Sequence, residues 1–89
     1  MKIKHPAVCG TLESSDVMIT VSPGDGEICI DLDSTVDMYY HDQIIKVMKE
    51  LLALEGISSA KIKAVDHGAL DCTIKARLKT ALVRSSKEV

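Results

Sequence analysis

The stretch "VMITVSPGDGEICIDL", residues 17–32, decides the fold. Its two ends, residues 17–22 and 27–32, place apolar residues at every second position, which is the pattern of strands with one buried face. The "PGDG" cluster between them, residues 23–26, is typical of a turn. The stretch therefore predicts a β-hairpin.

A helical pattern follows the second of these strands. Ser34 stands three residues before Asp37, which resembles a capping box at the start of a helix. Apolar residues then recur at three- and four-residue spacing, and Gly56 stands where a left-handed C-terminal cap is common. We expect one long helix over about residues 35–55, packed on the sheet.

The last third of the chain contains one clear strand and one ambiguous segment. Residues 60–65, "AKIKAV", predict a strand, and "DHG" at 66–68 predicts a turn. Residues 71–79 fit a strand by alternation, but the same segment also fits a helix. We favour a strand followed by a short helical turn, because a tight turn after a strand readily returns an antiparallel partner.

These elements predict an α+β fold with the order ββαββ. About four strands form an antiparallel sheet, one long helix packs on one face, and a short helical segment ends the chain. The 89 residues fit a single domain, residues 1–89. A domain of this size buries only a modest fraction of its surface, so a deep, water-excluding active site is not expected.

Composition and charge argue against several classes of partner. Tyr39 and Tyr40 are the only aromatic residues, so stacking on nucleic-acid bases is not expected. Residues 1–59 carry four basic and ten acidic groups, and residues 60–89 carry seven basic and three acidic groups. The acidic part argues against a nucleic-acid footprint over the whole domain. No stretch resembles a membrane span or an export signal, so we expect a cytoplasmic protein.

Cysteine and histidine spacing does not indicate a metal site. The three cysteines form no CxxC pair and suggest no disulfide framework, so we expect free thiols that are buried or half-buried. The three histidines lack the spacing of metal ligands, and we expect them to be solvated or to stabilise turns. These residues are Cys9, Cys29, Cys72, His5, His41 and His67.

Two groups of charged residues have both a functional and a simple interpretation. Asp31 and Asp33 share a strand face, which suits acid/base work or a cation site, but a solvated outer face is the favoured interpretation. Lys75, Arg77 and Lys79 share one face of the predicted last strand. They form either a solvated face or a cationic stripe that binds an acidic partner or phosphates, and both interpretations stay open.

The segment "GTLESSDVM", residues 10–18, sets Ser14 and Ser15 between Glu13 and Asp16. No histidine or lysine lies nearby in sequence to activate either hydroxyl. From the residues alone, the simplest interpretation is a loop that enters a strand, with the serine hydroxyls bonded to nearby backbone.

Two longer stretches carry a family resemblance. "AVCGTLESSDVMITVSP", residues 7–23, and "DHGALDCTIKARLKTALVRS", residues 66–85, resemble the acyl carrier protein (gamma) subunit of citrate lyase. That family shares an "AGTLESxDVM" opening and a "DxGALDCxxxARL" closing stretch. The resemblance covers essentially the whole chain, and Cys9 replaces the alanine of the "AGT" run.

The resemblance implies a covalent cofactor and no catalytic residue in this chain. In the family, the serine of the "LES" motif, here Ser14, carries phosphoribosyl-dephospho-coenzyme A through a phosphodiester, which makes the carrier a phosphoprotein. Ser15 occupies a position where the family can place glycine, so it is the less expected acceptor. An attachment serine needs no base of its own, because the transferase that modifies it brings the catalytic groups.

The resemblance also implies partners and a reaction. The thiol of the arm would carry an acetyl group, the alpha (acyltransferase) subunit would exchange acetyl for citryl, and the beta (citryl lyase) subunit would release oxaloacetate and regenerate the acetyl thioester. Citrate would thus be cleaved to acetate and oxaloacetate, with the carrier as a tether in a multi-subunit complex.

Three rival interpretations remain at this point. The acyl carrier subunit of malonate decarboxylase uses the same kind of arm, but its attachment region looks more like "GSGD" and lacks the "GALDC" stretch. A small scaffold module would leave Ser14 unmodified and bind an acidic partner through its basic residues. A hydrolase would need folding to bring His41 or His67 close to Ser14.

Overall fold

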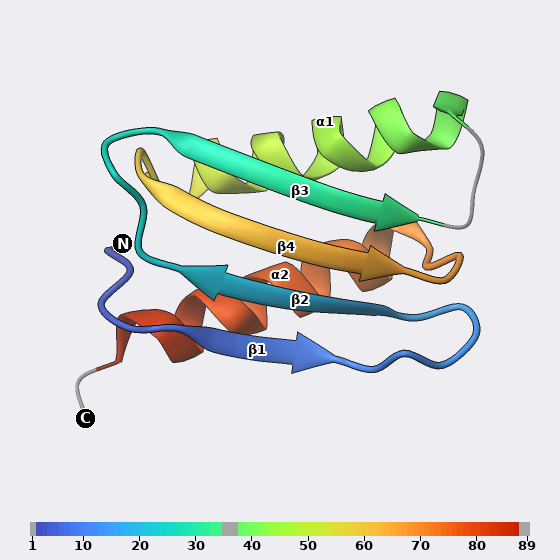
Figure 1. The fold of residues 1–89 in the computed structure, drawn as a ribbon, viewed down its shortest axis with the longest axis horizontal. Coiled ribbons are helices and arrows are strands. Elements are labelled where there is room, and N and C mark those ends of the chain that lie inside the picture. The colour runs from blue at the N-terminus through green and yellow to red at the C-terminus, as the bar shows by residue number, and fades with distance from the viewer. Residues whose placement is uncertain (1, 35–37, 88–89) are drawn as a thin grey trace.

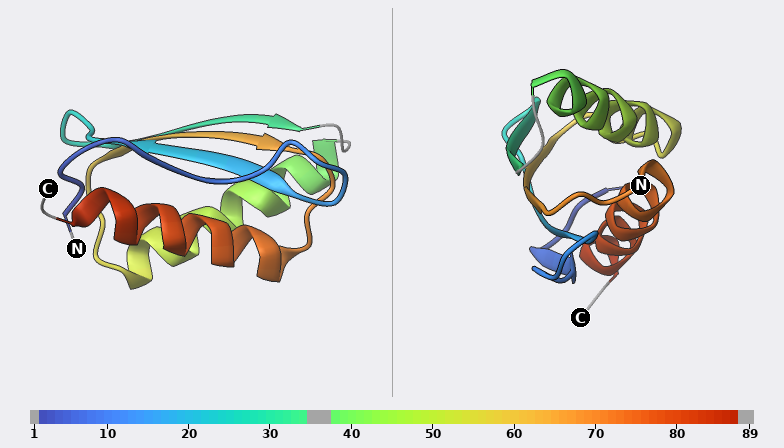
Figure 2. Two further views of the ribbon diagram at one scale, coloured as in Figure 1. Left: turned by 90° about the horizontal axis from the view of Figure 1, so that it is seen from below. Right: turned by 90° about the vertical axis from the view of Figure 1, so that its right-hand side faces the viewer.

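A computed structural model describes residues 2–34 and 38–87. One sheet has the strand order β1-β2-β4-β3, and both helices lie on the same face of it (Figures 1 and 2). The predicted α+β class is confirmed, and no helix in the described part of the chain could cross a membrane. The elements in chain order are β1 (Ala7–Gly10), β2 (Val17–Ser22), β3 (Ile28–Ser34), α1 (Met38–Leu54), β4 (Ala60–Asp66) and α2 (Asp71–Ser86).

The predicted hairpin is wrong, although both of its strands exist. β4 lies between β2 and β3, antiparallel to β2 and parallel to β3, so the sheet is mixed rather than antiparallel. Alternation identifies a strand with one buried face, but it does not identify the neighbouring strand. The inward residues of β4 are almost fully buried, as expected of a central strand, whereas those of β3 are half-buried at the edge.

The "PGDG" link crosses the beginning of β4 instead of closing a hairpin. The backbone N–H of Ala60 donates to the Glu27 carbonyl at 3.1 Å, and the Gly26 N–H donates to the Ser59 hydroxyl at 2.9 Å. A Cβ atom on Gly24 would lie 2.5 Å from the Ala60 nitrogen. The crossing therefore requires glycine at this position, because any side chain would collide with the backbone of β4.

The predicted long helix is confirmed as α1, and so is its C-terminal cap. Gly56 has a φ of 70°. Its N–H donates to the Ala53 carbonyl at 3.1 Å, and the Ile57 N–H donates to the Leu52 carbonyl at 2.9 Å, which is the hydrogen-bond pattern of a Schellman motif. The predicted capping box at the other end involves Asp37, which lies outside the described residues.

The predicted strand at residues 71–79 is wrong, because this segment is the first half of helix α2. Cys72 and Ala76, which a strand would have turned toward the core, are exposed. The fourth strand is β1, which pairs with β2. The fully buried residues of α2 follow the helical spacing; they are Ile74, Leu78, Ala81, Leu82 and Ser85.

The width of the sheet explains why a second helix forms. Four strands spaced about 4.8 Å apart extend beyond the cover of a single helix, which is about 10–12 Å across with its side chains. Helix α1 contacts β3 and α2, whereas α2 contacts β1 and β2 (Figure 2). Each helix therefore buries one half of the inner face.

A matched pair of substitutions tests the helical assignment of residues 71–86. Ala81→Glu places a carboxylate at a fully buried position and should lower the free energy of unfolding by more than about 3 kcal/mol. Ala76→Glu introduces the same group at an exposed position and should change it by less than about 0.5 kcal/mol. Urea unfolding followed by circular dichroism measures both. Greater damage from Ala76→Glu would contradict the helix.

Candidate functional site

The two serines lie in a tight turn between β1 and β2. The turn is at the end of the sheet where both helices begin (Figure 1). The N–H of Asp16 donates to the Glu13 carbonyl at 3.2 Å, so Ser14 and Ser15 are the two central residues of a β-turn. Ser14 thus stands at the outer corner of the turn, and its side chain is exposed.

Ser15 has a backbone conformation that favours glycine. Its φ is 64°, and it is the only residue other than glycine with a positive φ in the described part of the chain. A positive φ at the second central position is the signature of a type II turn, in which glycine is preferred. This geometry accounts physically for a position at which serine and glycine can both occur.

The turn is fastened to the loop between β4 and α2. The Ser15 N–H donates to the His67 carbonyl at 2.8 Å, and the His67 N–H donates to the Asp16 carbonyl at 2.9 Å. These two bonds extend the β2–β4 ladder beyond its last register pair, Val17 and Asp66. The backbone that directly follows Ser14 is therefore held by hydrogen bonds to the loop between β4 and α2.

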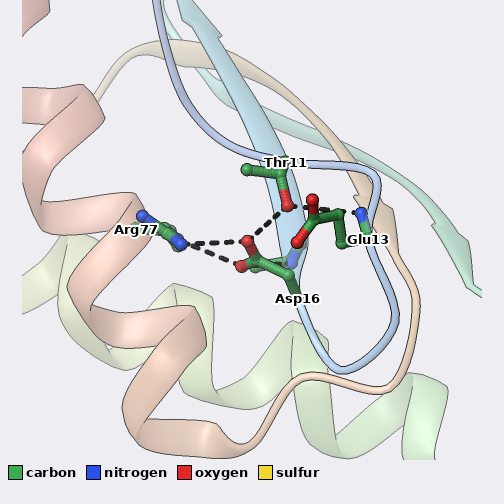
Figure 3. A network of polar contacts seen from close by, with 5 residues as sticks. Thr11, Glu13, Asp16 and Arg77 are labelled. Carbon is green, nitrogen blue, oxygen red and sulfur yellow. Dashed lines mark hydrogen bonds and ion pairs between the residues drawn. The ribbon is translucent and has the colours of Figure 1, made fainter.

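A buried carboxylate joins the turn to helix α2 (Figure 3). Asp16 Oδ1 accepts hydrogen bonds from Arg77 Nε at 3.1 Å and from the Val17 N–H at 2.8 Å. Asp16 Oδ2 accepts from Arg77 Nη2 at 2.9 Å and from the Thr11 hydroxyl at 2.6 Å. The Asp16 side chain is only 12% exposed. Its charge is therefore compensated by a two-point guanidinium contact.

This arrangement stabilises the ionised form of Asp16. The hydrogen bonds from Arg77, and then those from Thr11 and Val17, hold the pKa of the Asp16 carboxyl well below its usual range, against the opposing effect of burial. The same contact raises the pKa of Arg77. Asp16 is thus a permanently charged structural anchor at neutral pH rather than a proton donor or acceptor.

A second buried carboxylate shapes the neighbouring loop. Asp66 is 1% exposed, and it accepts hydrogen bonds from the backbone N–H groups of Gly68 at 3.2 Å and Ala69 at 3.0 Å. The Ser34 hydroxyl, at the end of β3, donates to it at 2.8 Å. The predicted "DHG" turn is confirmed, and Asp66 fixes its geometry.

No base among the described residues is hydrogen-bonded to Ser14. Among residues 2–34 and 38–87, no side chain hydrogen-bonds its hydroxyl, whereas nucleophilic catalysis needs a base within hydrogen-bond reach. His67 contributes backbone groups to the turn. His41 Nδ1 is buried without a hydrogen-bond partner in the described structure, and it lies 3.9 Å from the Asp42 carboxylate. The geometry therefore gives no support to the hydrolase interpretation.

Of the two predictions about other charged groups, the structure confirms one and contradicts the other. Asp31 and Asp33 lie exposed on the outer sheet face, as predicted. The predicted cationic strand face is wrong, because Lys75, Arg77 and Lys79 lie on helix α2. Arg77 pairs with Asp16, and Lys79 forms an ion pair with Glu55, whose side chain is largely buried, so two of the three cations are used inside the fold.

The three cysteines differ in exposure, and the described residues contain no metal-binding cluster. All three cysteines are free; Cys9 is buried as predicted, but Cys29 and Cys72 are exposed, which corrects that prediction. Within the described residues, no group of three or more His, Cys, Asp or Glu side chains could hold a metal ion.

The contact between Asp16 and Arg77 was missed from the sequence. Sixty-one positions separate the two residues, and no local pattern predicts such a pair. The only available signal was that both belong to the quoted family stretches, Asp16 in "LESxD" and Arg77 in "ARL". Both motifs can now be interpreted as two halves of one structural contact.

Comparisons with known proteins agree with these motifs. The family model described as ACP, malonate decarboxylase delta subunit (MdcD), matches residues 4–85. A citrate lyase acyl carrier protein of Streptococcus mutans is 50% identical over 88 residues, covering 98% of this chain and 86% of its own. One from Lactobacillus helveticus is 52% identical over 87 residues, covering 98% and 90%.

The fold also has a solved counterpart. A chain in the crystal structure of a Pseudomonas malonate decarboxylase hetero-tetramer in complex with malonate superposes with a TM-score of 0.78, over 97% of this chain and 93% of that one. The sequence identity is 19%, so this likeness concerns the fold alone.

The charge on Asp16 predicts a pH-dependent loss of stability. Because the folded state lowers the pKa of this carboxyl, its contribution is complete above the pKa of the unfolded chain, about 3.9, and is lost as pH falls below it. Asp16→Asn should therefore lower the melting temperature by several degrees at pH 7, and the difference from wild type should shrink below about pH 4. Thermal unfolding between pH 2.5 and 7 measures it. A difference independent of pH would contradict this role.

The positive φ of Ser15 predicts opposite effects for two substitutions. Ser15→Gly relieves left-handed strain at some cost in chain entropy, so stability should stay within about 1 kcal/mol of wild type or rise. Ser15→Val places a β-branched residue in the same conformation and should destabilise the protein by about 1–2 kcal/mol. Chemical denaturation of both variants tests the turn geometry. Equal stability of the two would refute it.

Proposed function

Since the chain belongs to the citrate lyase acyl carrier protein family, we propose that Ser14 carries the covalent arm through which it serves as acyl carrier. The observation that supports this best is the exposed Ser14 hydroxyl at the corner of a firmly held turn, with no partner among the described side chains. A modifying enzyme needs access to such a hydroxyl, and loops on a rigid scaffold provide it.

We further propose that the arm is phosphoribosyl-dephospho-coenzyme A, joined to Ser14 by a phosphodiester. When bound, this group supplies a thiol that holds acyl groups as thioesters. The residues around Ser14 are compatible with a phosphodiester, because Arg77 neutralises the Asp16 carboxylate beneath the turn and Glu13 is exposed, so that water screens its charge. The partial positive charge at the beginning of α2, at the same end of the molecule, also favours an anion there (Figure 1).

The partners follow from the same proposal. The carrier would present its arm to the alpha (acyltransferase) and beta (citryl lyase) subunits of citrate lyase, and to the transferase that attaches the arm. Its own contribution is tethering, since a covalent arm raises the local concentration of the acyl group at both active sites. Leu12 is two residues from Ser14 and 56% exposed, which provides an apolar contact for an enzyme that grips the turn.

Intact-protein mass spectrometry tests the attachment. Protein from cells that ferment citrate should show the mass of one phosphoribosyl-dephospho-coenzyme A adduct, and peptide mapping should place it within residues 10–18. An unmodified mass from such cells would overturn the proposal and favour the scaffold interpretation.

A pair of alanine variants assigns the adduct to one serine. Ser14→Ala should abolish the adduct and the acyl-carrying activity of the complex without loss of folding, because its side chain is exposed. Ser15→Ala keeps a Cβ in the same left-handed conformation and should retain the adduct. Loss of the adduct in Ser15→Ala but not in Ser14→Ala would show that the arm is attached to Ser15 and would contradict the assignment to Ser14.

A further inference from the structure

A small pocket lies at the same end of the molecule as the Ser14 turn. It has a volume of about 210 Å³ and is formed between the first turns of α1 and the loop that leads into α2. Pockets that hold drug-sized ligands measure about 300–1,000 Å³, so this one suits a fragment the size of a single ring system. Its lining residues are Tyr40, Gln43, Ile44, Asp66, Gly68, Ala69, Leu70 and Asp71.

The pocket combines an apolar floor with a polar rim. Ile44 is 5% exposed and contributes to the floor, whereas Tyr40 is 54% exposed and Leu70 is 70% exposed at the opening. At the rim, Gln43 Nε2 donates to Asp71 Oδ2 at 3.4 Å. Ile44 and Leu70 thus offer contact to an apolar face, and Gln43 and Asp71 offer hydrogen bonds to its edge.

These groups match adenine in particular. A purine can stack on a tyrosine ring, as bases do on aromatic side chains. The Gln43 amide can donate to a ring nitrogen of adenine and accept from its exocyclic amine, and Asp71 can accept from the same amine. In the same orientation guanine presents a carbonyl oxygen in place of the amine and would lose the hydrogen bond to Asp71, so it would have to turn in the pocket to present its own donors to this carboxylate.

The pocket is connected directly to the Ser14 turn. His67, which exchanges backbone hydrogen bonds with Ser15 and Asp16, is followed immediately by the pocket residues Gly68 and Ala69. Asp66, which shapes that loop, itself lines the pocket. A group anchored on Ser14 therefore starts from a turn that is hydrogen-bonded to the residue next to the pocket lining.

We propose that this pocket binds the adenine base of the arm attached to Ser14, an inference that rests on the proposed function. Dephospho-coenzyme A has its thiol at one end and its adenosine at the other. The thiol must be free to reach two partner enzymes, so the adenosine end is the anchored one. With the base stacked on Tyr40 and hydrogen-bonded to Gln43, the arm would leave the carrier in a defined direction. Only its pantetheine part would then move freely.

A nucleotide titration of the unmodified 89-residue chain tests the pocket without the arm. Adenosine 5′-monophosphate should shift the amide resonances of Gly68, Ala69 and Leu70 in nitrogen-15 correlation spectra, and guanosine 5′-monophosphate should bind at least about fivefold more weakly. Tyr40→Ala and Gln43→Ala should each weaken binding by about fivefold to tenfold. Lys49→Ala, an exposed residue further along α1, is the matched control and should change nothing.

Shifts absent from these amides, or equal binding of both nucleotides, would overturn the inference. The modified carrier provides a second readout: nuclear Overhauser contacts should join the adenine protons to the Tyr40 ring and the Ala69 methyl group, and Tyr40→Ala should remove them. An adduct on Ser14 with no such contacts would refute the pocket and leave the proposed function intact. An unmodified Ser14 would refute the proposed function, and the nucleotide titration would still decide the pocket.

Discussion

The contact of the Asp16 carboxylate with Arg77 supports the whole end of the molecule that carries Ser14. It joins the loop after β1, the beginning of β2 and helix α2 through one carboxylate. A carboxylate this poorly exposed is stable only when it is paired and hydrogen-bonded. The fold therefore fixes the base of the turn from beneath and leaves the outer corner, Ser14, in solvent.

Two buried carboxylates share this work through hydrogen bonds. Asp66 organises the loop before α2 through backbone N–H groups, and His67 connects that loop to the serine turn. In the sequence, Asp16 follows two serines that have no histidine or lysine nearby. In the structure, the Asp16 and Asp66 carboxylates accept hydrogen bonds that shape the loop before β2 and the loop before α2, and backbone hydrogen bonds join these two loops. An arm attached at Ser14, as proposed, would start from a fixed position, which would confine the volume that it explores.

Individual strands and helix α1 were predictable from the sequence, but the order in which the strands pair in the sheet was not. The strands 17–22 and 28–34, helix α1 and the cap at Gly56 all depend on residues a few positions apart, so periodicity and turn chemistry predicted them. The insertion of β4 between β2 and β3 depends on contacts between residues far apart in the sequence, which local patterns do not report. Residues 71–79 satisfy both periods, and the width of the sheet decides in favour of a helix.

The same division holds for the site. The candidate serine, Ser14, was selected from a motif of adjacent residues, whereas the contact that supports its turn was not predictable, since Asp16 and Arg77 meet only after the sheet and α2 have packed. Strand β1 was missed because Ala7–Gly10 is four residues long, too short for alternation to stand out. Gly10 is the last residue of β1. A Cβ atom there would lie 1.8 Å from the Val17 carbonyl oxygen, so this position requires glycine.

The segments near the two chain ends lie at the opposite end of the domain from the serine turn (Figure 1). The N–H groups of Lys4 and His5 both donate to the Ser85 carbonyl, at 2.8 and 3.2 Å, so the two ends lie side by side. Helix α2 runs from the serine turn to this point over 16 residues, or about 24 Å at 1.5 Å per residue. A label attached at Lys4 therefore lies at the opposite end of the domain from the serine turn, so the label and a group bound at the turn can be present at the same time.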